Sequence, residues 1–285
     1  MTANKSYHKL DNILITSISN FIKKDPALHK YYNFTYSTQT HTLYDILDGI
    51  IEIVKYGKPY RSSKTIPKST LNDAYSKLIT RGIIINTYID LLNKYLKKSP
   101  NKKLKCIFTD TTCIVNKYGS EDAKYFGHKK RVVTKVSFEC LSDGIPIKVM
   151  VANGSSNDSK IFKSQLKQPY LCNQLVVNKN KKYYIADSLY DGKENINLLL
   201  SNNFIPLIKS NPKNTKDKKL LKKKKMSAIQ FKIYKKRFNI EIFNGLIKSF
   251  RRIQTRYDKN SNIFLNTIIL GCIYRILYNM EKIKF

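Results

Sequence analysis

Four side chains near the C-terminal end of the chain have types and a spacing that suit phosphate chemistry. They are Tyr234, Arg237, Glu241 and Lys248, in the pattern Y-(2)-R-(3)-E-(6)-K. Because an α-helix turns by about 100° per residue, all four fall within a stripe about 60° wide. The stripe holds one carboxylate among three groups that can bind phosphate, which is typical of metal-assisted phosphate chemistry.

The helix that would carry this stripe is predicted over about residues 227–250. Apolar side chains lie on its other flank and predict that this flank packs against a core. They are Phe231, Phe238, Ile242 and Leu246.

Two aspartates in predicted strands can add further carboxylates. Asp110 lies in a strand predicted over 106–115, where mostly apolar and β-branched neighbours make an unpartnered charge costly. Asp187 directly follows a strand predicted over 183–186, at the junction of strand and loop where open α/β sheets gather ligands. Taken alone, each aspartate is explained equally well by a structural role. That role would be a hydrogen bond or ion pair for Asp110, and a cap on the following turn for Asp187.

If Asp110, Asp187 and Glu241 converge, their carboxylates can hold two Mg²⁺ or Mn²⁺ ions. Such a pair activates an attacking oxygen and stabilises the leaving oxygen in an in-line phosphoryl transfer. The histidines are too dispersed to indicate a zinc cluster, and they are His8, His29, His41 and His128.

The charge of the chain favours a polyanionic partner. Its 53 Lys and Arg against 20 Asp and Glu leave a formal charge of +33, which suits DNA or RNA. Part of this excess is also expected from an AT-rich genome, because Lys, Asn, Ile and Tyr are abundant together. The basic runs at 97–105 and 213–225 are interpreted as DNA backbone contacts, with solvated loops or nuclear import signals as alternatives.

Several features indicate an intracellular protein, without separating cytoplasm from nucleus. The five cysteines are scattered and form no C-x-x-C pair, which favours a reducing compartment. The first residues are polar and do not resemble a signal peptide. The apolar segment 263–278 is short and contains Asn266 and Arg275, so it predicts a buried helix and no membrane partner.

Hydrophobic periodicity divides the chain into two predicted domains. Apolar residues recur at helical spacing in four segments and predict a helical domain at 1–100. The segments are 7–24, 43–56, one that begins at residue 69, and 82–96. Its helix-turn-helix character is typical of DNA-binding modules, although most short helical bundles are only packing modules. Ser69 or Thr70 is available to cap the third of these helices.

The rest of the chain, 101–285, predicts an α/β domain with a mixed sheet. Strands are expected at 106–115, 132–141, 145–152, 183–186 and 204–208, and helices at 158–166, 193–202 and 263–282. A basic loop is expected over 209–225.

Several stretches together resemble the DDE transposases of insertion sequences, in the branch with a Y-R-E-K signature. They are Phe-Thr-Asp-Thr-Thr around Asp110, Ile-Ala-Asp-Ser-Leu-Tyr-Asp-Gly around Asp187, the spaced residues 234 to 248, and Tyr-Phe-Gly-His-Lys-Lys at 125–130. The resemblance covers about residues 43–280.

This resemblance implies a ribonuclease H-like fold, two divalent ions, and cutting and strand transfer at the ends of a mobile element. The expected partners are double-stranded DNA, as element ends and target, and a second copy of the chain in a dimer on DNA. The implied metal triad is Asp110, Asp187 and Glu241. The implied contacts to the DNA end are Tyr234, Arg237 and Lys248, and the arginines directly behind the helix, Arg251 and Arg252, are expected to add to them.

The chain departs from the family pattern at three places near these motifs. Leu189 stands where a glycine is usual, Tyr60 where a tryptophan is common, and Asn157 where a histidine is common. None of them removes a predicted metal ligand. Two alternatives therefore stay open: a domesticated or inactive transposase that only binds DNA, and a ribonuclease H-like nuclease acting on RNA–DNA hybrids.

Overall fold

The computed structural model describes residues 2–32, 41–98, 105–170, 182–211 and 226–282. Its internal contacts divide the chain into two compact units. Unit 1 comprises Met1–Tyr95 and Ile247–Phe285, and unit 2 comprises Leu96–Leu246. The division into domains at 1–100 and 101–285 stays a prediction, and the two units are described separately below.

Unit 1 is built from helices that sequence periodicity largely predicts. They are α1 (Thr2–Lys24), α2 (Pro26–Tyr32), α3 (Leu43–Tyr56), α4 (Lys68–Thr80), most of α5 (Ile83–Lys98), α12 (Arg251–Gln254) and α13 (Ser261–Lys282). The Thr42 side chain caps α3, and Gly57 ends it with a φ of 65°. The expected Ser or Thr cap of α4 is wrong, because that helix begins one residue earlier, after Pro67.

The core of unit 1 joins α13 to the N-terminal helices. Tyr274 of α13 donates to Asp11 of α1, whose carboxylate also forms an ion pair at 2.8 Å with Lys55 of α3. The Tyr75 and Thr267 hydroxyls are 2.9 Å apart between α4 and α13. Among the described helices, α13 alone is long and apolar enough to cross a membrane, but most of it is buried as in a core helix.

Unit 2 is organised around a mixed sheet. Its strands are β1 (Cys106–Asn116), β2 (Lys124–Phe126), β3 (Arg131–Leu141), β4 (Pro146–Asn153), β5 (Lys182–Ala186) and β6 (Phe204–Ile208). The order across the sheet is β4-β3-β1-β5-β6, with β2 beside the N-terminal end of β3. β1 is antiparallel to β3 and parallel to β5, and β5 is parallel to β6.

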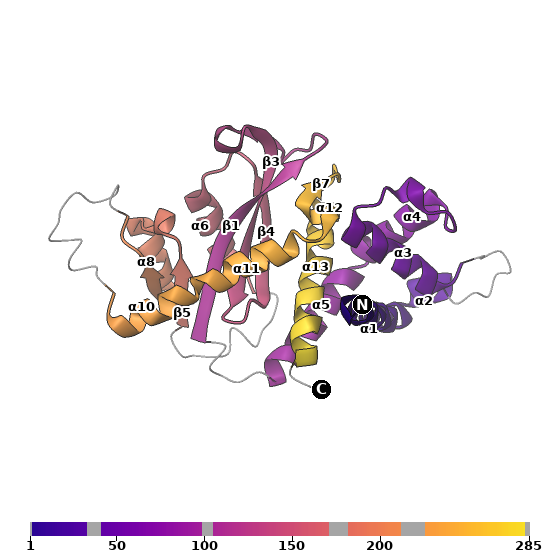
Figure 1. Ribbon diagram of the computed structural model, residues 1–285, viewed down its shortest axis with the longest axis horizontal. Coiled ribbons are helices and arrows are strands. Elements are labelled where there is room, and N and C mark those ends of the chain that lie inside the picture. Colours follow the sequence, from indigo (N-terminus) through magenta and orange to yellow (C-terminus); the bar gives the residue numbers. More distant parts are fainter. Residues whose placement is uncertain (1, 33–40, 99–104, 171–181, 212–225, 283–285) are drawn as a thin grey trace. The chain divides into compact units, whose positions relative to one another are not determined.

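Helices cover both faces of this sheet. Phe138 of β3 packs edge-on against Phe243 of α11 (Phe238–Ile247), with ring centroids 5.0 Å apart. Ser137, the preceding residue, donates instead to Gln165 of α6 (Asp158–Lys167). Because successive side chains of a strand point to opposite faces, α11 and α6 lie on opposite faces (Figure 1). α8 (Lys193–Ser201) packs beside α6 and against β6.

The helix predicted over 227–250 is interrupted. α10 (Ala228–Tyr234) and α11 are joined by a 3₁₀ turn at Lys235–Arg237 (Figure 1). Each residue of a 3₁₀ turn rotates the chain by about 120°, compared with about 100° in an α-helix. Over the three residues of this turn, the side-chain stripe of α10 is therefore rotated by about 60° relative to that of α11.

The expected packing of the apolar flank of this helix is wrong. Phe231, Phe238, Ile242 and Leu246 are all exposed. The buried apolar side chains of α11 are Ile240, Phe243 and Ile247, at positions i, i+3 and i+7. Because α11 is apolar nearly all round, its sequence pattern alone did not identify the face that packs.

A charged pair lies inside unit 2, between the sheet and α6. Glu139 of β3 is fully buried, and Lys148 Nζ of β4 lies 3.5 Å from its Oε1 atom. The same ammonium donates to the carbonyl oxygens of Gln165 and Gln168. Burial raises the pKa of Glu139, and Lys148 partly offsets this. Removing either charge alone would leave the other buried without compensation.

We therefore expect Lys148→Met to destabilise the protein by about 3–5 kcal/mol. The loss should be largest at neutral pH and smaller in acid, because protonation of Glu139 removes the uncompensated charge and its pKa is already raised. The double variant Lys148→Met/Glu139→Gln should recover most of the loss. Urea unfolding measures this, and a single variant as stable as the original protein would contradict it.

Candidate active site

The two predicted aspartates lie side by side because of the register of parallel strands. β1 pairs with β5 through Phe108 and Ile185, so the same register two residues further places Asp110 level with Asp187. Parallel strands lie about 5 Å apart. On the other side of β1, Asp110 pairs with Phe138 of β3. Directly paired residues point to the same face of a sheet, so the Asp110 side chain lies on the face covered by α11.

Asp110 is a largely buried carboxylate held by helix α11. Its Oδ2 atom accepts a 2.8 Å hydrogen bond from Asn244 Nδ2. Burial raises the pKa of Asp110 to about 6, although the hydrogen bond from the Thr111 N–H and the charge of Arg237 both lower this pKa. Asp187 and Glu241 raise the pKa further, so all three predicted carboxylates interact electrostatically.

Asp187 begins the turn that follows β5. Its Oδ1 atom accepts from the Ser188 N–H at 2.6 Å and caps the 3₁₀ turn Ser188–Tyr190. Within the described residues, its Oδ2 atom accepts no hydrogen bond. Leu189, in place of the family's usual glycine, points to solvent, while Tyr190 is buried and donates to Thr111 Oγ1 at 3.1 Å. The turn therefore accommodates the leucine and leaves one oxygen of Asp187 available.

Glu241 is bonded to its neighbour on the same helix face. Its Oε1 atom lies 2.5 Å from Arg237 Nη2, across one turn, and its side chain is 43% exposed. The stripe geometry predicted from the sequence thus brings Arg237 and Glu241 together. In this arrangement, Arg237 partly neutralises Glu241 and also lowers the pKa of Asp110.

Tyr234 and Lys209 lie at the same end of the sheet. The Tyr234 ring is buried, and Lys209 Nζ is 5.2 Å from its centroid. Burial raises the pKa of Tyr234, and Arg237 counters that shift while Asp187 adds to it. Ala186 pairs with Ile208, so the register places Lys209, the next residue of its chain, level with Asp187. A cation therefore borders the carboxylates on the side of β6.

The remaining predicted DNA contacts belong to unit 1. Lys248 follows the last residue of α11 and is half-buried, and Arg251 is exposed at the start of α12. Arg252 is buried, and its guanidinium is 2.7 Å from Asp258 and stacks on the Tyr60 ring. Its role as a DNA contact stays a prediction. The basic segment 213–225 and the part of the other run at 99–104 lie outside the described residues.

The donor set suits a hard divalent cation in composition, although the carboxylates are not gathered around one point. Among the described residues, no three acidic, histidine or cysteine side chains lie close enough to hold an ion. Asn244, however, is buried beside Asp110 with its Oδ1 atom lacking a partner in the described part of the chain. This orphaned oxygen and the repulsion among the carboxylates are both relieved by an oxygen-seeking cation.

Sequence reasoning missed Asn244 and the position of Lys209. Asn244 lies three residues after Glu241, on the same side of the helix, so the helical spacing contained a signal for it. Lys209 was assigned to a basic loop, and only the pairing of β5 with β6 shows that it borders Asp187.

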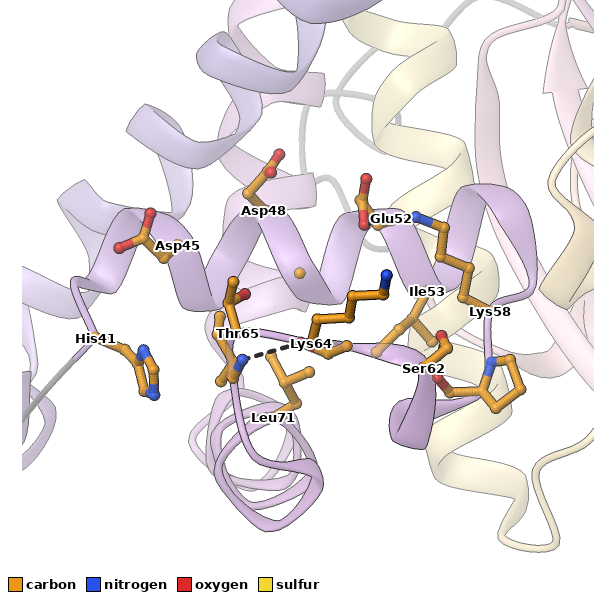
Figure 2. A pocket seen from close by; sticks show the side chains of 14 residues that line it. His41, Asp45, Asp48, Glu52, Ile53, Lys58, Ser62, Lys64, Thr65 and Leu71 are labelled. Carbon is orange, nitrogen blue, oxygen red and sulfur yellow. Dashed lines mark hydrogen bonds and ion pairs between the residues drawn. The ribbon is translucent and has the colours of Figure 1, made fainter.

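A separate pocket of about 590 Å³ lies in unit 1 between α3 and the segment 58–71. Figure 2 shows Asp45, Asp48 and Glu52 along α3, with Lys58 and Lys64 reaching from the opposite side. Asp45 forms the capping box with Thr42, and Glu52 forms an ion pair with Lys58 at 2.9 Å. Asp45 and Glu52 therefore have structural roles, and we assign no chemistry to the pocket.

The raised pKa of Asp110 predicts a stability gain when its charge is removed. Between the ordinary pKa of 3.8 and the folded value of about 6, the folded chain retains a proton that the unfolded chain loses. The ionised group therefore lowers stability above about pH 6. Asp110→Asn should raise the free energy of unfolding there by up to about 3 kcal/mol, with the gain fading as the pH falls to about 4. Unfolding of both proteins across this range measures it, and an unchanged or pH-independent difference would contradict it.

Comparison with known protein families gives one match that covers most of the chain. The model of the transposase DDE domain matches residues 101–276, which include all three predicted acidic residues. A comparison with curated proteins gave no match. The mixed α/β sheet with its flanking helices is consistent with such a domain. The chain belongs to the transposase DDE domain family.

Proposed function

We propose that this protein is a DNA transposase that cuts and joins the ends of a mobile element with Asp110, Asp187 and Glu241 as its catalytic acids. The observation that supports this most strongly is the parallel register that sets Asp110 level with Asp187. The electrostatic effects of Asp187 and of Glu241 on Asp110 add to it. The family match and the formal charge of +33 both favour double-stranded DNA as the partner.

The proposed triad would hold two Mg²⁺ or Mn²⁺ ions, with Asn244 Oδ1 as an additional oxygen beside them. Bound divalent ions lower the pKa of the attacking water or hydroxyl and stabilise the leaving oxygen. The protein's own contribution is to hold Asp110 rigidly, through Asn244 on one side and the sheet on the other. Asp187 stays oriented through its capped turn.

The phosphates of the DNA end would be held by the groups bordering the acids. The raised pKa of Tyr234 keeps its hydroxyl protonated and able to donate to a phosphate oxygen. Arg237 and Lys209 add positive charge next to it. Lys248 and Arg251, directly after α11, are proposed as further contacts to the same end.

The strand order supports a ribonuclease H-like catalytic domain as part of this proposal. β1, β5 and β6 are parallel, β3 is antiparallel to β1, and both acids lie on the two central parallel strands or their ends. We further propose that the N-terminal helices contribute to DNA binding and that two copies join on the DNA, because two element ends must be brought together.

Glu241→Gln and Asp187→Asn should each abolish metal-dependent cleavage of DNA that carries the element's terminal repeats. Loss of a ligand to catalytic metal typically removes several orders of magnitude in rate. Glu194→Gln is the matched control, because Glu194 lies on exposed α8 and pairs only with Lys163 among the described residues. Gel assays of cleavage with Mg²⁺ measure this. Full activity in either triad variant would exclude the site, and DNA binding without cleavage by the unaltered protein would favour the non-catalytic alternative.

The ion pair between Arg237 and Glu241 suggests an order of events for the proposed site. Arg237 cannot hold Glu241 and a DNA phosphate with the same donors at full strength. We propose that a phosphate of the DNA end takes over Arg237, after which Glu241 turns to the metal. Metal and DNA binding would then reinforce each other.

Arg237→Gln should therefore increase Mn²⁺ affinity several-fold in the absence of DNA, because it frees Glu241 and removes a positive charge near Asp110. The same variant should bind DNA more weakly. Lys236→Gln is the matched control, since Lys236 is exposed, adjacent and of equal charge. Calorimetric titration with Mn²⁺ measures the effect. Equal Mn²⁺ affinities for Arg237→Gln and Lys236→Gln would refute the release of Glu241.

A further inference from the structure

A basic hairpin stands at one end of the sheet in unit 2, and no function has been assigned to it above. β2 pairs with the beginning of β3, and the strands are joined by a turn over Gly127–Lys130. The Lys130 N–H closes that turn onto Gly127 O at 3.1 Å, with Lys130 at a φ of 49°. The turn and both strand ends are solvent-exposed.

The hairpin is held firmly at its base. The Gly154 N–H donates to Asp122 O at 2.9 Å, and a Cβ atom at this glycine would lie 1.9 Å from Val133 O. On one side of β2, the Phe126 ring lies under Lys135 Nζ at 4.6 Å. That ammonium is itself fixed by Asp158 Oδ1 at 2.8 Å. The hairpin is therefore a preorganised projection of the sheet.

Positive charge is concentrated on this projection. Lys124, Lys129, Lys130 and Arg131 account for half of the residues in 124–131, whereas Lys and Arg make up 53 of 285 in the whole chain. All four are exposed, and none has an ion pair within the described residues. The buried lysines 135 and 148 are, by contrast, each paired with a carboxylate. The hairpin thus offers charges that the protein itself does not neutralise.

An exposed apolar pair lies on one face of the hairpin, opposite the face of Lys124 and Arg131. Tyr125 is 63% exposed and pairs across the hairpin with Val132, which is 42% exposed. An exposed ring next to a basic turn suits the sugar–phosphate backbone of a nucleic acid, whose sugars pack on apolar surfaces while its phosphates take the charges. An acidic protein surface would lack that alternation.

We propose that the hairpin at 124–132 is a sequence-independent contact to the backbone of duplex DNA, separate from the residues that hold the DNA end at the acids. This inference rests on the proposed function only for its partner, DNA. Lys129, Lys130 and Arg131 neutralise phosphates, and Tyr125 packs against a neighbouring sugar. The contact strengthens binding to any DNA, so it adds affinity without adding sequence information.

The test compares two full-length triple variants with equal loss of charge. Lys129→Gln/Lys130→Gln/Arg131→Gln removes the hairpin charges. Lys160→Gln/Lys167→Gln/Lys193→Gln removes three exposed lysines of α6 and α8, which also have no ion pair within the described residues. Dissociation constants for a duplex of arbitrary sequence are measured by fluorescence anisotropy over a series of KCl concentrations. Circular dichroism melting verifies that all three proteins are folded.

We expect the hairpin variant to reduce the slope of log K against log salt by about 3, because each phosphate contact contributes about 0.9. The control variant should reduce it by less than about 1. Equal reductions in both variants, or no reduction in the hairpin variant, overturn the hairpin contact and leave the proposed function standing. Absence of salt-dependent DNA binding by the unaltered protein overturns both together.

Discussion

The site depends on the register between β1 and β5, which brings Asp110 of β1 near Asp187, the residue directly after β5. That register pairs the buried residues Phe108 and Ile185, two positions before the aspartates, and so anchors both chain segments in the core. Burial of Asp110 and repulsion from its acidic neighbours together raise its pKa to about 6. The fold thus maintains an electrostatic strain at one place, as is usual for functional sites.

The surrounding groups can be understood as responses to that strain. Asn244 donates to Asp110, the Ser188 N–H donates to Asp187, and Arg237 pairs with Glu241. Each interaction stabilises a negative charge only in part, and the Oδ1 atom of Asn244 is left without a partner in the described chain. A divalent cation supplies what these groups lack, which is why we favour metal-dependent transfer over a passive DNA-binding role. Arg237, which pairs with Glu241 here, is the group that we propose passes to a phosphate of the DNA end.

Local sequence patterns predicted the helices and strands better than their packing. The predicted strand at 204–208 matches β6, and the helix at 43–56 matches α3, because alternation and capping signals are local. The three-residue strand β2 is too short to show alternation, and it was missed. The hydrogen bond between Asn244 and Asp110 joins residues 134 positions apart, and no periodicity encodes it. The outward face of α11 was mistaken for the inward one, because nearly every side of that helix is apolar and only the sheet decides which side is buried.

The central claim is that the three acids bind divalent metal as one site. Its most direct test is anomalous scattering from crystals of the protein bound to a DNA end and grown with Mn²⁺. The account predicts manganese peaks between the carboxylates of Asp110 and Asp187, with Glu241 turned away from Arg237 and joined to the metal. Well-ordered carboxylates with no manganese between them, or manganese bound only elsewhere on the chain, would contradict it.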